Sequence, residues 1–142
     1  MDEVPLTGGG RNAVSRRGDS VLRETGPWAA AVHALLRHLE AVGFEGAPRV
    51  VDSGFDERGG EVLSFIEGEF VHPHAWSEEA RPGLGRLLRA LQVATESFLV
   101  PADAIWRSWH GRRLGDAGTG IGHCDTGPWN VVARNALPCA LI

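Results

Sequence analysis

Three polar residues near the end of the 142-residue chain have types and spacing that could do chemistry. His123, Asp125 and Asn130 form the pattern H-x-D-x-x-x-x-N, directly before the apolar pair Val131-Val132. A carboxylate at Asp125 could accept the proton of an attacking hydroxyl and orient that hydroxyl. An amide oxygen five residues later, across a turn, could reach a magnesium ion. The pattern predicts Asp125 and His123 as catalytic residues, with His123 bracing the loop, and Asn130 as a metal ligand.

The same residues have a plainer interpretation. His, Asp and Asn are common in loops, and Asp125 and Asn130 could simply cap the backbone of a solvated turn. His72 and His74 form an H-x-H pair with no third ligand nearby in sequence, so we do not expect a metal site built from imidazoles. Cys124 lies beside Asp125, whose charge disfavours a thiolate, so we do not expect a cysteine nucleophile.

The elements expected to position this loop begin with a small antiparallel sheet. Short β-compatible segments occupy residues 4–7, 13–17, 20–24, 49–54 and 61–66, and Gly18-Asp19 predicts a tight hairpin turn between the second and third. A helix is predicted from Pro27, because apolar side chains recur on one face at Val32, Leu35, Leu36 and Leu39. Gly43 predicts the end of that helix.

The second half of the chain predicts a hinge loop, a second helix and a strand. The loop follows Glu67-Gly68-Glu69, and Ser77 could cap a helix after it. That helix carries a stripe of four leucines, at positions 84, 87, 88 and 91, which we expect to be core. A polar stretch to about Gly122 then leads to the loop and its short strand. The predicted class is α+β.

The loop in its full form resembles a known family. Pro128 and Trp129 directly before Asn130 make it similar to the H-G-D-x-x-P-x-N loop of aminoglycoside phosphotransferases and the related choline and homoserine kinases. The resemblance implies a protein-kinase-like fold with an antiparallel-sheet N-lobe and one helix over residues 1–70. Residues 71–142 would then hold the first helix and the catalytic loop of an incomplete helical C-lobe.

The resemblance continues upstream and implies a nucleotide site. Five residues, Gly8, Gly9, Gly10, Arg11 and Asn12, look like the family's loop over the ATP phosphates. Arg23 stands where the family usually has a phosphate-binding Lys. Three residues, Ser64, Phe65 and Ile66, resemble the strand and hinge whose backbone holds adenine. The alternatives are a flexible hairpin tip for the glycines and a solvent-facing side chain for Arg23.

The chain also departs from the family. The first turns of the helix after Pro27 lack the Glu expected to pair with Arg23, and the chain ends at Leu141-Ile142, where the family continues with a metal-binding Asp. The resemblance implies an enzyme that transfers a phosphoryl group from ATP, with Mg²⁺, to a hydroxyl of a small polar molecule. We expect impaired activity in a chain truncated on its C-terminal side. The alternative is a catalytically inactive product, or a module that binds a nucleotide or a partner.

Composition narrows the partners. The net charge is −4, and all 14 basic residues are Arg with no basic run, so we expect neither nucleic acid nor a membrane as a partner. The N-terminus lacks the features of a secretory signal, and the two cysteines suggest no disulfide framework, so we expect a cytoplasmic protein. An uncovered leucine face predicts marginal stability or self-association.

Overall fold

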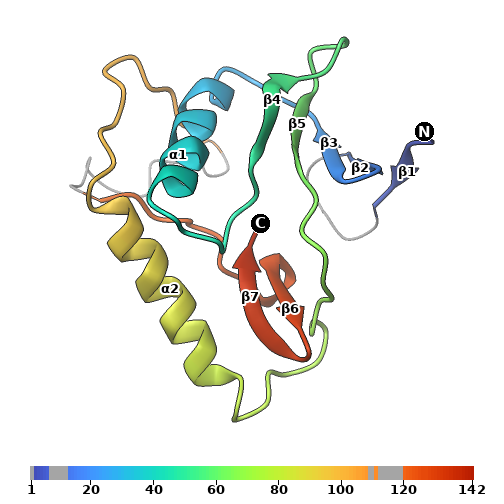
Figure 1. The fold of residues 1–142 in the computed structure, drawn as a ribbon, viewed down its shortest axis with the longest axis vertical. Helices are drawn as coiled ribbons and strands as arrows, with labels where there is room; N and C mark the ends of the chain where they lie inside the picture. Colours follow the sequence, from blue (N-terminus) through green and yellow to red (C-terminus); the bar gives the residue numbers. More distant parts are fainter. Residues whose placement is uncertain (1, 7–12, 109–110, 112–119) are drawn as a thin grey trace.

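A five-stranded antiparallel sheet forms the upper part of the molecule (Figure 1). The computed structural model describes residues 2–6, 13–108, 111 and 120–142. The sheet has the order β1-β2-β3-β5-β4. Its strands are β1 (Val4–Pro5), β2 (Val14–Arg17), β3 (Ser20–Arg23), β4 (Val50–Phe55) and β5 (Glu61–Ser64). Gly18 has φ +60° in the tight turn between β2 and β3, which confirms the predicted hairpin.

Helix α1 (Ala29–Ala41) packs beside β4 and supplies much of the core. Its buried residues Leu36 and Leu39 form a cluster with Phe44 and with Leu63 of β5. The helix ends as predicted at Gly43, which has φ +79° and donates its N–H to the Glu40 carbonyl. Only glycine adopts this conformation without strain, so the chain reverses there and brings Phe44 under the helix.

Helix α2 (Arg81–Thr95) begins four residues after Ser77, and the turn that Ser77 caps leads directly into it. The Ser77 hydroxyl accepts a hydrogen bond from the Ala80 N–H at 3.2 Å. Leu87 and Leu91 pack against the core cluster, but Leu88 is 40% exposed. The prediction that the whole leucine stripe is core is therefore wrong at Leu88. Adjacent helical residues point about 100° apart, so Leu87 and Leu88 cannot both face the same core.

A second, two-stranded sheet holds the end of the chain. A short 3₁₀ helix, η1 (Pro128–Asn130), leads into β6 (Val131–Arg134), which pairs with β7 (Leu137–Leu141). The two turn residues Asn135 and Ala136 both have positive φ, at +51° and +60°, as a two-residue hairpin turn requires. The hairpin lies between α2 and the segment that follows β5 (Figure 1).

The segment after β5, predicted as a hinge, is joined to this hairpin. Glu69 and Ala133 exchange two backbone hydrogen bonds of 2.8 and 2.9 Å, and the Arg134 guanidinium donates to the Glu67 carbonyl at 3.0 Å. A Cβ at Gly68 would lie 2.4 Å from the Val132 side chain, so only glycine allows this close approach. The junction is therefore a packed, hydrogen-bonded contact.

No helix in the described ranges is long and apolar enough to cross a bilayer. The described elements are an antiparallel sheet, two α-helices and a C-terminal hairpin. A kinase-like arrangement, with a boundary near residue 70, stays a prediction.

Candidate functional site

A buried carboxylate links three elements of the sheet and its helix. Glu61 at the start of β5 is only 2% exposed. One of its oxygens accepts a hydrogen bond from Nε of Arg23, its register partner on β3, and the other lies 2.9 Å from Nε2 of His33 on α1. A buried carboxylate is costly unless it is paired, and here both oxygens have nitrogen partners. Arg23, Glu61 and His33, named here the Arg–Glu–His triad, thus fasten α1 to the sheet.

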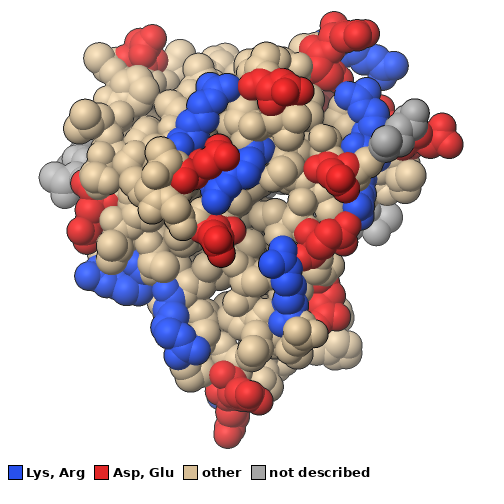
Figure 2. Space-filling view, viewed as in Figure 1, with Lys and Arg blue, Asp and Glu red and all other residues tan. Residues whose placement is uncertain are grey.

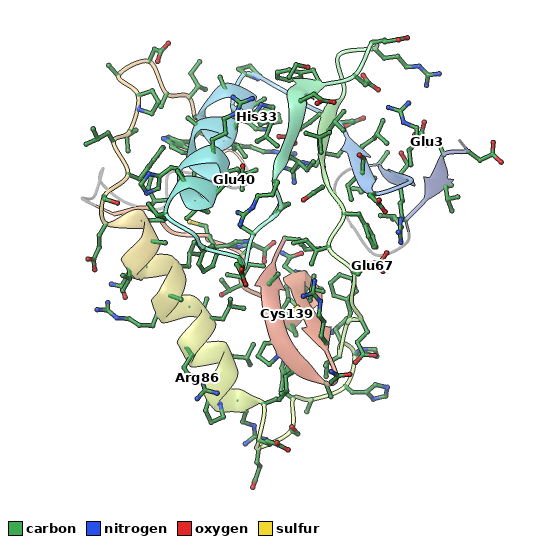
Figure 3. All side chains as sticks on the ribbon, in the orientation of Figure 1. Glu3, His33, Glu40, Glu67, Arg86 and Cys139 are labelled. Atoms are coloured by element: carbon green, nitrogen blue, oxygen red, sulfur yellow. The ribbon has the colours of Figure 1, made fainter. Side chains whose placement is uncertain are left out.

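The position of His33 depends on the strand beside it. His33 is 3% exposed and lies on the side of α1 that faces the sheet (Figure 3). Its ring is 4.9 Å from the ring of Phe55 in β4. Gly54 makes room for it, since a Cβ there would lie 2.4 Å from Cε1 of His33. Gly54 also has φ +86°, so β4 bends at this point around the imidazole.

Sequence reasoning missed two members of the triad. It predicted Arg23 as a functional residue and noted that α1 lacks an acidic partner for it, but that partner comes from the neighbouring strand as Glu61. The available signal was a charged residue at the start of an otherwise apolar strand. His33 precedes Leu36 by three residues and so shares its buried face, a spacing that could also have indicated a buried imidazole.

The structure brings His123, Asp125 and Asn130 together in one compact loop. The Asn130 side-chain N–H₂ donates to the Asp125 carbonyl at 2.9 Å, and the Asp125 N–H donates to Nδ1 of His123 at 3.3 Å. Asn130 also accepts a backbone hydrogen bond from the Ile142 N–H at 3.0 Å. Within the described residues, no hydrogen bond or ion pair joins this loop to Arg23. The loop and the Arg–Glu–His triad are therefore two separate groups.

The environment of His123 favours a neutral ring. Burial lowers the pKa of His123 from its ordinary value of 6.5, while hydrogen bonding to the Ile142 backbone and the charge of Asp125 oppose that shift. Because Nδ1 accepts from Asp125, the neutral ring carries its proton on Nε2. His123 thus holds the backbone of Asp125 through Nδ1.

Polar side chains in this loop are used to hold its own backbone. Cys124 has φ +65°, a strained value for a residue with a side chain, and its thiol lies 3.5 Å from the Gly122 carbonyl. The Asn130 amide closes the turn by bonding Asp125. Among the residues that the structure describes, no group of three or more His, Cys, Asp and Glu side chains is placed to hold a metal ion.

The remaining predicted site residues lie elsewhere. Gly8, Gly9, Gly10, Arg11 and Asn12 fall outside the described residues. Ser64 and Phe65 use their N–H groups inside the sheet, bonding the carbonyls of Arg49 and Asp19, each at 2.8 Å. The Ser64 hydroxyl accepts a further hydrogen bond from the Arg49 N–H, and Ile66 is half-buried. The expected binding of ATP and Mg²⁺ stays a prediction, as does the assignment of these residues to a site.

Comparison with known proteins gives one informative relative. No family model matches the chain. A protein of Rhizobium leguminosarum bv. trifolii is 62% identical to it over 141 residues, which are 99% of this chain and 54% of the relative. That relative is named Trifolitoxin immunity protein. The chain thus spans about half the length of the curated relative that it matches.

The name of this relative contradicts the phosphotransferase interpretation. A protein similar over almost the whole chain is named for immunity and not for phosphoryl transfer. The assignment to the aminoglycoside phosphotransferase and choline kinase-like family, the predicted kinase activity on a hydroxyl and the status as a transferase are therefore corrected. The physical reason lies in the loop: the H-x-D-x-x-x-x-N spacing also suits a turn in which Asn130 and His123 bond the backbone of Asp125.

Proposed function

We propose that this chain acts in immunity to trifolitoxin or to a toxin of the same kind. The observation that carries the proposal is the 62% identity with the Trifolitoxin immunity protein over 99% of the chain. Identity at this level, spread over both the sheet and the C-terminal hairpin, leaves little of the chain without a counterpart in that relative. The chain spans about half the length of the relative. The immunity for which the whole relative is named is therefore carried over to this chain as a proposal.

Protection of a sensitive strain tests this function directly. The chain is expressed from a plasmid in a bacterium whose growth trifolitoxin inhibits, and growth is measured against toxin concentration. The expected result is a shift of the inhibitory concentration to at least about tenfold higher values than with the empty plasmid, an effect well above the scatter of growth assays. Immunoblotting for the soluble chain shows whether it accumulates.

A destabilised variant provides the matched control. Gly54→Ala forces a Cβ against His33 and should lower the amount of folded chain, so protection should fall with the soluble level. Gly59→Ala changes a glycine that has open space around it and should leave protection close to that of the natural chain. Full sensitivity of cells that accumulate the folded natural chain would contradict the proposal for this chain.

A further inference from the structure

A groove runs along α2 where this helix passes the segment that joins α1 to β4. Its lining residues include Val42, Phe44, Arg86, Arg89, Ala90 and Val93. We call this feature the α2 groove. Gly85 and Ala90 keep one wall low, and a Cβ at Gly85 would meet nothing within 4 Å. The groove is therefore shallow and open along the helix.

The groove is apolar at its floor and stays exposed. Val42 and Val93, which line it, are 47% and 49% exposed. A contiguous exposed apolar surface on a folded protein commonly marks a site for a partner. Apolar surface alone could bind many kinds of partner. The charged residues beside it therefore indicate which kind of partner binds.

Both charged residues that line the groove are arginines. Helix α2 contains three arginines, Arg81, Arg86 and Arg89, and no acidic residue, although the whole chain has a net charge of −4. Arg89 donates to Gln92 at 2.9 Å and lies 4.0 Å from Glu96. Within the described part of the chain, neither Arg81 nor Arg86 forms an ion pair. Figure 2 shows basic side chains over the lower left of the molecule, where Figure 1 places α2 and Figure 3 labels Arg86.

The helix dipole and charge pairs within the helix do not account for these arginines. A cation in the first turn, such as Arg81, opposes the helix dipole, and exposed helices usually gain stability from pairs of opposite charge four residues apart. Helix α2 has no such pair within its own bounds. Arginine is also the side chain that best holds a carboxylate, through two parallel N–H groups.

We propose that the α2 groove binds a peptide segment of a partner protein that carries both apolar and acidic side chains. The apolar side chains lie on Val42 and Val93, above the buried Phe44, and the carboxylates pair with Arg86 and Arg89 at the rim. This inference concerns a binding surface and goes beyond the proposed immunity, since it is tested on the purified chain without toxin.

Two other occupants fit the charges less well. In a symmetric pair of copies the same face meets itself, so the arginines of one α2 would oppose those of the other. An anionic membrane would attract arginines, but stable attachment through basic residues generally takes a cluster of about four to eight. A peptide with carboxylates meets the charge of the groove.

Binding of two designed peptides tests the proposal. The probe is a fluorescein-labelled peptide of about three helical turns, with Leu at helical spacing on one face and Glu elsewhere, and its twin has Lys in place of each Glu. Fluorescence anisotropy with the purified chain should show binding of the Leu–Glu peptide and at least about tenfold weaker binding of the Leu–Lys twin. Arg86→Glu should weaken binding of the Leu–Glu peptide about tenfold or more and strengthen binding of the twin.

Arg58→Glu is the matched control, because it makes the same charge change on the exposed turn between β4 and β5. It should leave the affinity within about twofold of the natural chain. Circular dichroism should show both variants folded, since neither side chain is buried. Equal binding of both peptides, or an Arg86→Glu affinity equal to that of Arg58→Glu, would overturn the proposal.

Two further measurements address the other occupants. Sedimentation of the chain in low salt should show a monomer; a dimer that Arg86→Glu dissociates would place a second copy in the groove and overturn the proposal. Cosedimentation with vesicles of phosphatidylserine and phosphatidylcholine should leave the chain in solution. Binding to these vesicles that Arg86→Glu abolishes would show a membrane site instead.

Discussion

Gly54 and His33 show how a single residue determines the join between α1 and the sheet. Strand β4 passes close to the His33 imidazole at Gly54, where the backbone has φ +86°. Because Gly54 has no side chain, the imidazole has room to reach Glu61. The triad then satisfies both oxygens of a carboxylate that would otherwise be costly to bury. A single methyl group at this glycine is therefore expected to disturb three elements together.

Gly54→Ala should lower the free energy of unfolding by about 2–4 kcal/mol, from a left-handed backbone cost of about 1 kcal/mol and the displacement of His33 at about 1–3 kcal/mol. Gly59→Ala separates the two contributions. Gly59 has φ +78° but nothing within 4 Å of the added Cβ, so only about 1 kcal/mol should be lost. Urea titration of both variants measures the difference, and equal losses would show that His33 does not resist the methyl group.

His123 should make stability depend on pH. Burial lowers the pKa of His123 below its ordinary value of 6.5, so the unfolded chain takes up a proton more readily than the folded chain. The stabilisation from this group is fully present above pH 6.5 and is lost as the pH falls from 6.5 through the lower folded-state pKa. The natural chain should therefore lose stability on acidification in this range.

His123→Gln removes this dependence and tests it. The free energy of unfolding, measured in urea at about pH 7.5 and about pH 5, should fall less in His123→Gln than in the natural chain. His74→Gln replaces an exposed histidine and should behave like the natural chain. An unchanged pH dependence in His123→Gln would show that the ring is protonated equally easily in the folded and unfolded states.

Helix α2 has one face that packs against the core and another that is exposed to solvent. Leu87 lies against the buried cluster of Leu36, Leu39, Phe44 and Leu63, whereas Leu88 faces away from it. The same helix carries the exposed arginines that line the α2 groove. One face of α2 therefore holds the molecule together, and the other presents its surface to solvent.

Leu87→Ala should cost about 2 kcal/mol or more of stability, because it leaves a cavity against the core cluster. Leu88→Ala should change stability by less than about 1 kcal/mol, since its side chain already contacts water. The two substitutions remove the same atoms from neighbouring positions, so each is a control for the other. Chemical denaturation gives the comparison, and similar losses would contradict the orientation of the helix.

The whole molecule combines exposed apolar surface with a basic helix on an acidic chain. The sequence-based expectation of self-association stays a prediction, and the charges on α2 indicate the conditions under which it should occur. Like charges on facing copies of α2 repel at low ionic strength, and salt screens that repulsion while leaving the apolar attraction in place.

Sedimentation velocity should therefore show a monomer at about 0.05 M salt and a larger mean mass at about 1 M salt, where the screening length falls to about 3 Å. Val93→Glu places an acidic side chain on the exposed apolar face and should reduce the association at high salt. Association at low salt that dissolves as salt is added would instead indicate that opposite charges hold the copies together.

The sequence by itself determined the features that depend on a few neighbouring residues. The Gly18-Asp19 turn, the apolar stripe of α1 and its end at Gly43 are confirmed, because backbone conformation and helical periodicity act over short distances. The loop pattern at His123, Asp125 and Asn130 was also correctly seen as a unit. The phosphotransferase activity inferred from it was wrong, because the relative that matches almost the whole chain is named for immunity. The same spacing also allows the side chains to bond their own turn.

Only the tertiary structure decided which distant groups meet. Arg23, Glu61 and His33 come from two strands and a helix, and no local pattern shows that a carboxylate at the start of β5 is buried between an arginine and an imidazole. Likewise, the choice between Leu87 and Leu88 depends on how α2 docks onto the core. Contacts of this kind depend on the packing of whole elements, which the short-range preferences of a chain do not specify.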